Sequence, residues 1–132
     1  MIDLKRLKGA NLAKVLIIED DPLINKMYSE KLARDGFEVE IAPNGLEGLE
    51  KMKANPPDLV ILDIMMPKMG GIEVIDEMKK DTRLEKIPII VLSNLSESPD
   101  IERAKKRNIK EYLVKSDLDP EDVSKTVKKY LG

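Results

Sequence analysis

Five side chains that could do chemistry stand directly after four short apolar runs of the sequence. Glu19 and Asp20 follow the first run, Asp63 the second, Ser93 the third and Lys115 the fourth. If these runs are parallel strands of one sheet, their carboxyl ends lie at one edge, where open α/β sheets bind ligands. Three carboxylates, one hydroxyl and one ammonium would then converge at that edge.

Such a cluster needs a further positive charge. Two like charges about 4 Å apart repel by about 1 kcal/mol in water and by about 4 kcal/mol at an effective dielectric constant near 20. One lysine cannot neutralise three carboxylates, whereas a hard divalent cation could, and Mg²⁺ prefers oxygen ligands. We expect Mg²⁺, with Mn²⁺ as the second choice. A phosphoryl group would suit the remaining positions, with the metal, Lys115 and Ser93 on its oxygens and a carboxylate as the nucleophile.

Composition excludes several other kinds of site. The 132 residues include no cysteine and no histidine, so disulfides, zinc sites built on those residues, Ser-His-Asp triads and a phosphohistidine are excluded on this chain. Lys and Arg total 23 against 25 Asp and Glu, giving a net charge of −2, which does not indicate a nucleic-acid or membrane binder. No apolar run approaches the roughly 20 residues of a membrane span. We expect a cytoplasmic protein.

The chemical residues would be positioned by five alternating strands and helices. The strands are predicted at 15–18, 37–42, 59–62, 87–92 and 112–114. The helices are marked by apolar residues at helical spacing within 24–32, 46–52, 72–78, 101–109 and 123–131. Most strands are continuously apolar, as expected when both faces of a parallel sheet are covered. Alternation with short connections predicts a doubly wound α/β sheet.

Local residues support these boundaries. Asp21-Pro22 and Asp119-Pro120 each place a capping residue before a proline, which is typical of a helix start. Asp35-Gly36 is typical of a helix end, and the prolines after Asn55 block helix continuation before the third strand. One domain with no internal repeat or linker accounts for the chain.

The residues at the strand ends resemble those of the receiver domain of bacterial two-component response regulators. The matching segments, in order and at matching spacing, are VLIIEDDP at 15–22, LVILDIMMPKMGG at 59–71, PIIVLS at 88–93 and YLVK at 112–115. The resemblance implies a flavodoxin-like, three-layer α/β/α fold, with a five-stranded parallel sheet of order 2-1-3-4-5 and five helices. It implies a stand-alone receiver domain at 14–132, and leaves a leader at 1–13 outside the match.

The resemblance also implies a role for each residue that would hold the metal. Asp63 would be the phosphoacceptor and a metal ligand. Asp20 would bind Mg²⁺ directly and Glu19 through water, while Met65 would contribute its backbone carbonyl. A sensor histidine kinase or a histidine phosphotransfer protein would donate the phosphoryl group, in agreement with the absence of histidine from this chain.

The remaining roles implied by the resemblance concern the switch. Lys115 would pair with Asp63 or its phosphate, and the hydroxyl of Ser93 would turn toward the phosphoryl group. Tyr112 would be the aromatic switch residue, although a plain edge-strand aromatic is the alternative. The fourth helix, the last strand and the last helix would then change their common face for an unknown downstream protein. A monomer or weak dimer is expected, without direct contact to nucleic acid.

Three residues depart from the pattern of the family. Lys115 is followed by Ser116 where proline with a cis bond is usual, and cis costs about 2.5–4 kcal/mol without proline. We therefore predict a trans bond, or a strained cis bond held by the site. Asn94 is larger than the usual residue there, and Met65 offers no polar group to position an attacking water. Both favour slow self-dephosphorylation.

Two other functions compete with this one. A pseudo-receiver would keep the fold and act as a phosphorylation-independent interaction module; the intact site disfavours it, whereas Ser116 and Asn94 leave it open. A magnesium-dependent phosphatase would usually need a second acid where Met65 stands, so we expect no enzyme beyond assistance to the domain's own phosphorylation and dephosphorylation. The basic stretch 103–110 is either a solvated helix or a dock for an acidic partner.

Overall fold

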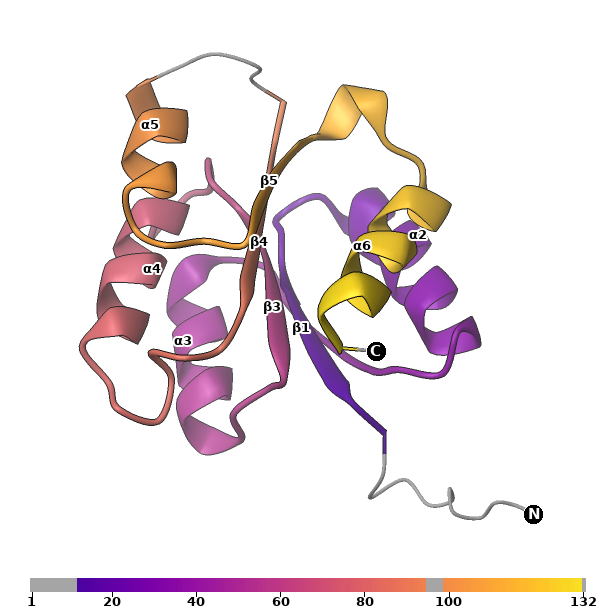
Figure 1. The fold of residues 1–132 in the computed structure, drawn as a ribbon, viewed down its shortest axis with the longest axis horizontal. Coiled ribbons are helices and arrows are strands. Elements are labelled where there is room, and N and C mark those ends of the chain that lie inside the picture. The colour runs from indigo at the N-terminus through magenta and orange to yellow at the C-terminus, as the bar shows by residue number, and fades with distance from the viewer. Residues whose placement is uncertain (1–11, 95–98, 132) are drawn as a thin grey trace.

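Five parallel strands form the centre of the computed structural model, which describes residues 12–94 and 99–131 (Figure 1). They are β1 (Lys14–Ile18), β2 (Glu38–Ala42), β3 (Leu59–Asp63), β4 (Ile89–Ser93) and β5 (Glu111–Val114). Their spatial order is β2-β1-β3-β4-β5, with every neighbouring pair parallel. The predicted sheet order 2-1-3-4-5 is confirmed. Most of the leader predicted at 1–13 lies outside the described residues.

Five α-helices of the described chain cover the two faces of this sheet. They are α2 (Pro22–Arg34), α3 (Gly45–Ala54), α4 (Gly71–Lys79), α5 (Pro99–Lys105) and α6 (Pro120–Leu131), with a 3₁₀ turn, η2 (Lys115–Asp117), after β5. Figure 1 shows α3, α4 and α5 on one face and α2 and α6 on the other. The structure thus has the three layers that the sequence predicted. In the described part of the chain no helix combines the length and apolar character needed to cross a membrane.

The continuous apolar runs supply both cores at once, because successive strand residues point to opposite faces. One core contains the strand residues Leu16, Ile18, Val60, Leu62, Ile89 and Val91, packed against α3, α4 and α5. The other contains Val15, Ile17, Leu59, Ile61, Ile90 and Leu92, packed against α2 and α6. A strand buried on both faces cannot slip in register without placing a charged neighbour in the core. The residues that end each strand are therefore held in fixed positions.

The predicted helix boundaries follow from local chemistry. The side chain of Asp21 caps α2 by accepting hydrogen bonds from the backbone N–H groups of Leu23 and Ile24. Gly36, with φ of 100°, takes the left-handed conformation that glycine adopts without steric cost and turns the chain toward β2. Asn44 caps α3 by accepting a hydrogen bond from the N–H of Glu47.

The fourth helix is shorter than its sequence pattern predicted. It ends at Lys105, and the chain then turns through Asn108, whose φ is 60°. Ile109 lies outside the helix yet still packs against the core beside α5. Two apolar residues from which other helices were predicted are also exposed: 40% of the surface of Met27 and 48% of that of Leu46 is accessible to solvent. Both still lie on helices, but on the solvent side of the buried stripe.

The strand order sets where a ligand can bind. The chain passes from β1 to β2 on one side and then to β3 on the other side of β1. Connections therefore leave the carboxyl ends of β1 and β3 in opposite directions, which opens a crevice between them. This is the edge of the sheet at which the sequence analysis predicted the site residues.

Candidate functional site

A pocket of about 320 Å³ opens at the carboxyl edge of the sheet. It is lined by Glu19, Asp20, Asp21, Ile24, Asp63, Met65, Ser93, Asn94 and Lys115. The residues come from the ends of β1, β3, β4 and β5 and from the start of α2. The structure thus brings together every predicted site residue except Tyr112, which does not line the pocket.

Asp63 is the last residue of β3, and only 5% of its surface is exposed. One carboxylate oxygen, Oδ1, accepts a hydrogen bond of 3.2 Å from the backbone N–H of Met65. The other, Oδ2, lies 3.3 Å from the ammonium nitrogen of Lys115. Burial raises the pKa of Asp63, while Lys115 and the Met65 N–H oppose that rise. The carboxylate is therefore held in place on both oxygens at the base of an open pocket.

Glu19 follows β1 and is the most buried acid of the site, with 1% of its surface exposed. Its Oε2 accepts a hydrogen bond of 3.0 Å from the N–H of Asp21, and its Oε1 lies 2.5 Å from Lys115 Nζ. Burial raises the pKa of Glu19 to about 7, against the opposing effects of Lys115 and the Asp21 N–H. The charge of Asp63 raises it further. Asp20, in contrast, is exposed at the pocket mouth.

Lys115 is the one cation among the described residues that line the pocket. Its side chain is 8% exposed and contacts both Glu19 and Asp63. Burial alone would lower the pKa of Lys115, but the two carboxylates outweigh burial and raise it. The ammonium therefore stays charged and bridges the two buried acids. Because Asp20 adds a third carboxylate, the pocket remains negative overall.

The three carboxylates fit a hard divalent cation. One ligand oxygen from each of Glu19, Asp20 and Asp63 lies within 4.8 Å of the other two. Oxygen donors with excess negative charge are the donor set that Mg²⁺ and Mn²⁺ prefer. Met65 also lines the pocket, and its backbone N–H donates to Asp63.

Ser93 and Tyr112 connect the pocket to the edge of the sheet. Ser93 ends β4, is 1% exposed and is paired in register with Val114 of β5. The hydroxyl of Ser93 lies near the phenol of Tyr112. Burial raises the pKa of that phenol, and the nearby Ser93 hydroxyl opposes the rise. Tyr112 is half-buried on β5 and packs against the core beside α5, so a hydroxyl of the pocket lies next to the outer strand.

The structure shows two features of the site that the sequence patterns did not. The first is the short Glu19–Lys115 pair, because the lysine was expected to pair with Asp63. The second is Asn25 of α2, whose amide N–H₂ donates a 2.7 Å hydrogen bond to the carbonyl of Glu19. Its own amide oxygen is buried without a hydrogen-bond partner among the described residues. A signal existed, since Asn25 interrupts the buried stripe that continues with Tyr28 and Leu32.

The bond after the lysine is trans, because no cis peptide bond occurs in residues 12–94 and 99–131. The first of the two geometries predicted for Lys115-Ser116 is confirmed. The backbone instead turns through η2, in which the N–H of Leu118 donates to the carbonyl of Lys115. Ser116 and Asp117 are exposed in this turn.

Fold and pocket together define a doubly wound α/β domain with an acidic pocket at its switch point. Comparison with known families gives a match to the response regulator receiver domain over residues 15–128. The chain therefore belongs to this family. Receiver domains bind Mg²⁺ at an acidic pocket, and Glu19, Asp20 and Asp63 form the corresponding cluster here.

Individual relatives cover almost the whole chain. The polar-differentiation response regulator DivK of Brucella anthropi is 33% identical over 118 residues, covering 89% of this chain and 95% of that protein. The chemotaxis response regulator CheY4 of Vibrio cholerae superposes with a TM-score of 0.84 at 31% identity, covering 90% and 98% of the two chains. The phosphorylated cyanobacterial phytochrome response regulator RcpA superposes with a TM-score of 0.83 at 29% identity, covering 92% and 95%. These similarities extend to sequence as well as fold.

Proposed function

We propose that the protein is a phosphorylation-dependent signalling switch in which Asp63 accepts a phosphoryl group. The donor is a phosphohistidine of a separate sensor kinase or phosphotransfer protein. One observation carries the proposal: the Asp63 carboxylate lies at the base of an open pocket, fixed by the Met65 N–H and by Lys115 at 3.3 Å. The phosphorylated state of the relative RcpA supports the same chemistry.

The transfer forms one bond and breaks another. A carboxylate oxygen of Asp63 bonds to phosphorus as the bond from phosphorus to the donor nitrogen breaks, and the histidine takes up a proton. Lys115 is placed to neutralise charge on the transferred group. Mg²⁺, held by Asp20, Asp63, Glu19 through water and the Met65 carbonyl, would supply the further positive charge that this group requires. The lysine, by holding Glu19 and Asp63 together, keeps the acceptor oriented.

The readout of the switch starts at Ser93. Ser93 lines the pocket, and its hydroxyl lies near the phenol of Tyr112 of β5. When Ser93 turns toward a phosphoryl oxygen, the polar surroundings of that phenol change, so the tyrosine and the face formed by α5, β5 and α6 rearrange for a downstream protein. The arrangement is a two-state element that a ligand biases through differential contacts.

The switch assists only its own phosphorylation and dephosphorylation. Met65 is 57% exposed at the pocket and carries no polar group to orient an attacking water. Asn94 also lines the pocket, where its side chain would shield the phosphoryl group. Both residues favour a long-lived phosphoprotein rather than turnover of an external substrate.

The remaining parts of the proposal concern context. Residues 14–132 form the receiver domain, and 1–13 are a leader outside it. The protein acts in the cytoplasm as a monomer or weak dimer, and it signals by protein contact without binding nucleic acid or membrane.

The test is the intact mass of the protein after incubation with acetyl phosphate or phosphoramidate, with and without Mg²⁺. We expect a gain of one phosphoryl group that requires Mg²⁺ and is absent in Asp63→Asn. Asp117→Asn is the matched control, because Asp117 is exposed close to the site and does not line the pocket. It should be labelled as the wild type is.

Two outcomes would contradict the proposal. Labelling of Asp63→Asn to the wild-type level would place the acceptor elsewhere. No labelling from either donor, by a protein whose circular dichroism shows it folded, would favour the phosphorylation-independent interaction module. The lifetime of the phosphoprotein is a separate test. Loss of the phosphoryl group from Asp63 within seconds would refute the proposal that Met65 and Asn94 slow its hydrolysis.

A further inference from the structure

The end of α5 and the turn after it carry a concentration of positive charge that the phosphorylation site does not use. Residues 103–110 include five cations and no acid, in a chain whose net charge is −2. Two of the five are arginines with acidic partners. Arg103 Nη1 lies 3.0 Å from Asp100, and Arg107 makes two bonds to Asp76 of α4, at 2.6 and 3.3 Å. Their charges are compensated within the domain.

The other three cations have no such compensation. Lys105, Lys106 and Lys110 are exposed, and their ammonium groups make no hydrogen bond or ion pair with any residue of the described chain. Glu102 lies about one helical turn before Lys105 and Lys106 and forms no ion pair with either of them. We refer to these three lysines as the basic ridge.

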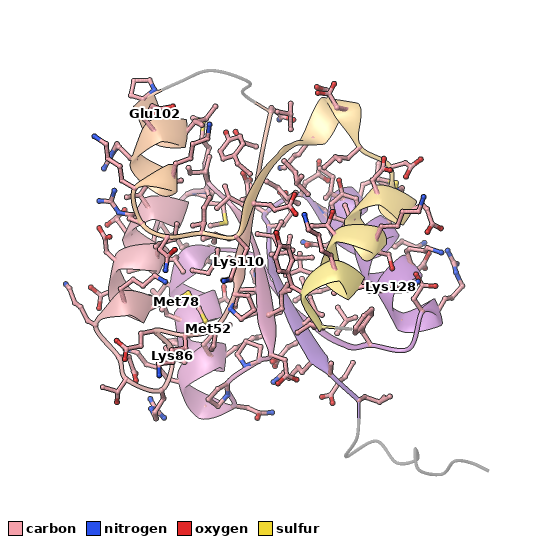
Figure 2. The ribbon with its side chains drawn as sticks, viewed as in Figure 1. Met52, Met78, Lys86, Glu102, Lys110 and Lys128 are labelled. Carbon is pink, nitrogen blue, oxygen red and sulfur yellow. The ribbon has the colours of Figure 1, made fainter. Side chains whose placement is uncertain are left out.

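The basic ridge lies away from the acidic pocket. Helix α5 runs antiparallel to the strands, so its last residues lie toward the edge where β4 and β5 begin. The N–H of Lys110 donates to the carbonyl of Ile89, the first residue of β4, whereas Ser93 at the other end of β4 lines the pocket. Figure 2 shows Glu102 near the start of α5, and Lys110 farther along, beyond the end of the helix.

The structure holds the basic ridge in place independently of the pocket. Ile101 and Ala104 anchor α5 in the core, and they are 5% and 0% exposed. Arg107 ties the turn after α5 to α4 through Asp76, and also donates a 2.8 Å bond to the carbonyl of Arg103. None of these contacts involves a residue that lines the phosphoacceptor pocket. We therefore expect these contacts to hold the ridge in both states, while the rearrangement proposed for this face is centred on Tyr112.

We propose that the basic ridge anchors an acidic polypeptide segment of a protein partner in both states of the switch. Charge complementarity selects an anion. The free cations are lysines, whereas both neighbouring arginines, which recognise phosphate through two parallel bonds, are occupied by Asp100 and Asp76. A carboxylate-rich peptide therefore fits it better than a nucleic acid does.

This inference goes beyond the proposed function and does not depend on it. If it holds, two functions are separate: the ridge keeps the partner bound, and Ser93 and Tyr112 transmit the phosphorylation state to that bound partner. An electrostatic anchor of this kind speeds association and weakens as salt screens it.

The experiment measures binding of a fluorescently labelled glutamate-rich peptide to the full chain by anisotropy. We expect the dissociation constant to rise at least about fivefold between about 50 and about 300 mM NaCl, because screening shortens the range of the charges. The triple variant Lys105→Glu, Lys106→Glu, Lys110→Glu should bind about tenfold more weakly at low salt. The wild type should bind equally tightly before and after incubation with acetyl phosphate and Mg²⁺, with the extent of labelling checked by intact mass.

The matched control reverses three exposed lysines on other helices. Lys26, Lys53 and Lys125 lie on α2, α3 and α6 and have no ion pair within the described chain, so their reversal to Glu gives the same net charge as the ridge variant. It should retain most of the wild-type affinity. Circular dichroism and the thermal midpoint check both variants, and the corresponding Lys→Gln triples replace any that fail to fold.

Three results would overturn the proposal. Equal losses of peptide affinity in the two triple variants would show that the peptide is attracted by the overall charge of the protein and not by the ridge. A single-stranded oligonucleotide of matched charge that binds more tightly than the peptide, with loss in the ridge variant, would assign the ridge to nucleic acid. Loss of peptide binding when the wild type is phosphorylated would tie the ridge to the acceptor. Failed phosphoryl labelling with intact peptide binding would leave the anchor standing and reject the proposed switch alone.

Discussion

Lys115 is the residue on which the electrostatics of the site depend. Its ammonium lies between two buried carboxylates, at 2.5 Å from Glu19 and 3.3 Å from Asp63. Removing one partner of a buried ion pair costs more than the pair itself contributes, since a charge is left buried without compensation. Lys115 therefore stabilises the two ionised acids as neighbours.

The first prediction is that Lys115→Met lowers the free energy of unfolding by about 3 kcal/mol in metal-free buffer. Added Mg²⁺ should recover more stability in this variant than in the wild type, because the acids there have lost their own cation. Urea denaturation with EDTA and then with Mg²⁺ measures both effects. Lys125→Met, at an exposed position on α6, is the control and should change little. Equal Mg²⁺ effects in wild type and variant would contradict this account.

Glu19 makes stability depend on pH in an unusual direction. Burial raises its folded pKa to about 7, from an ordinary value of 4.5. Between these two values the folded state binds more protons than the unfolded state, so stability falls as pH rises. Burial raises the pKa of Asp63 as well, which adds to the same trend.

The second prediction compares wild type with Glu19→Gln across this window. Without metal, the thermal midpoint of the wild type should fall relative to that of Glu19→Gln by several degrees between about pH 5 and about pH 8. Calorimetry in EDTA-containing buffers measures the difference between the two proteins. Parallel curves for the two proteins would show that Glu19 does not titrate in this range.

At this scale most of the site was predictable from sequence. Glu19, Asp63, Ser93 and Lys115 follow apolar runs, and the geometry of parallel strands brings such positions together. The preference of Lys115 for Glu19 could not be predicted, because it depends on side-chain positions within the folded pocket. The support of the Glu19 carbonyl by Asn25 was missed for the same reason, although a polar residue on a buried stripe was a visible signal.

The loop between β3 and α4 packs against the backbone of the acceptor, Asp63, and helps to hold it in position. Gly71 begins α4, and a Cβ atom there would lie 2.7 Å from Ile64 Cα and 2.8 Å from the carbonyl oxygen of Asp63. Both are backbone atoms, which cannot move aside without displacing the acceptor. The neighbouring Gly70 has more room, since its nearest such atom would be the carbonyl oxygen of Ile64 at 3.7 Å.

The third prediction uses this pair of glycines. Gly71→Ala should lower the free energy of unfolding by about 1–3 kcal/mol, as overpacking does, and should slow phosphoryl labelling of Asp63. Gly70→Ala should be close to wild type in both respects. Denaturant unfolding and the time course of labelling by mass spectrometry distinguish them. If the two variants behave alike, close backbone packing does not position the acceptor.

Most helices and strands were predicted from the sequence, and the end of one helix was not. The β1, β3 and β4 runs are apolar on both faces and could form only buried strands. Their order came from the resemblance to the family, because alternation alone does not choose an order. The end of α5 was misjudged because Ile109 was counted as an apolar marker of the helix. The turn at Asn108 is set by the packing of Ile109 on the core, which is a tertiary effect.

The whole molecule separates two kinds of charge. Carboxylates gather at the carboxyl edge of the sheet around one lysine, while the three lysines of the basic ridge cluster at the end of α5 and in the turn after it. A net charge of −2 conceals this separation, which appears only once the fold is known. The acidic edge is suited to a cation and a phosphoryl group, and the basic ridge is suited to an acidic partner.

The fourth prediction tests the acidic edge through the stability of the whole molecule. A ligand that binds only the folded state stabilises it by an amount that grows with the logarithm of its concentration, reaching about 2.7 kcal/mol at 100 times its dissociation constant. Mg²⁺ should therefore raise the thermal midpoint progressively. Asp20→Asn should abolish most of this increase while leaving the metal-free midpoint near that of the wild type, because Asp20 is exposed.

The control for this prediction is Asp117→Asn, which removes an equally exposed carboxylate that does not line the pocket. It should respond to Mg²⁺ as the wild type does, and Mn²⁺ should stabilise both proteins in the same way, since its ligand preferences are similar. An unchanged response in Asp20→Asn would mean that the cation binds elsewhere on the acidic surface. An equal response to a monovalent salt at matched ionic strength would reduce the effect to screening, and the three carboxylates would then have to be held together by Lys115 alone.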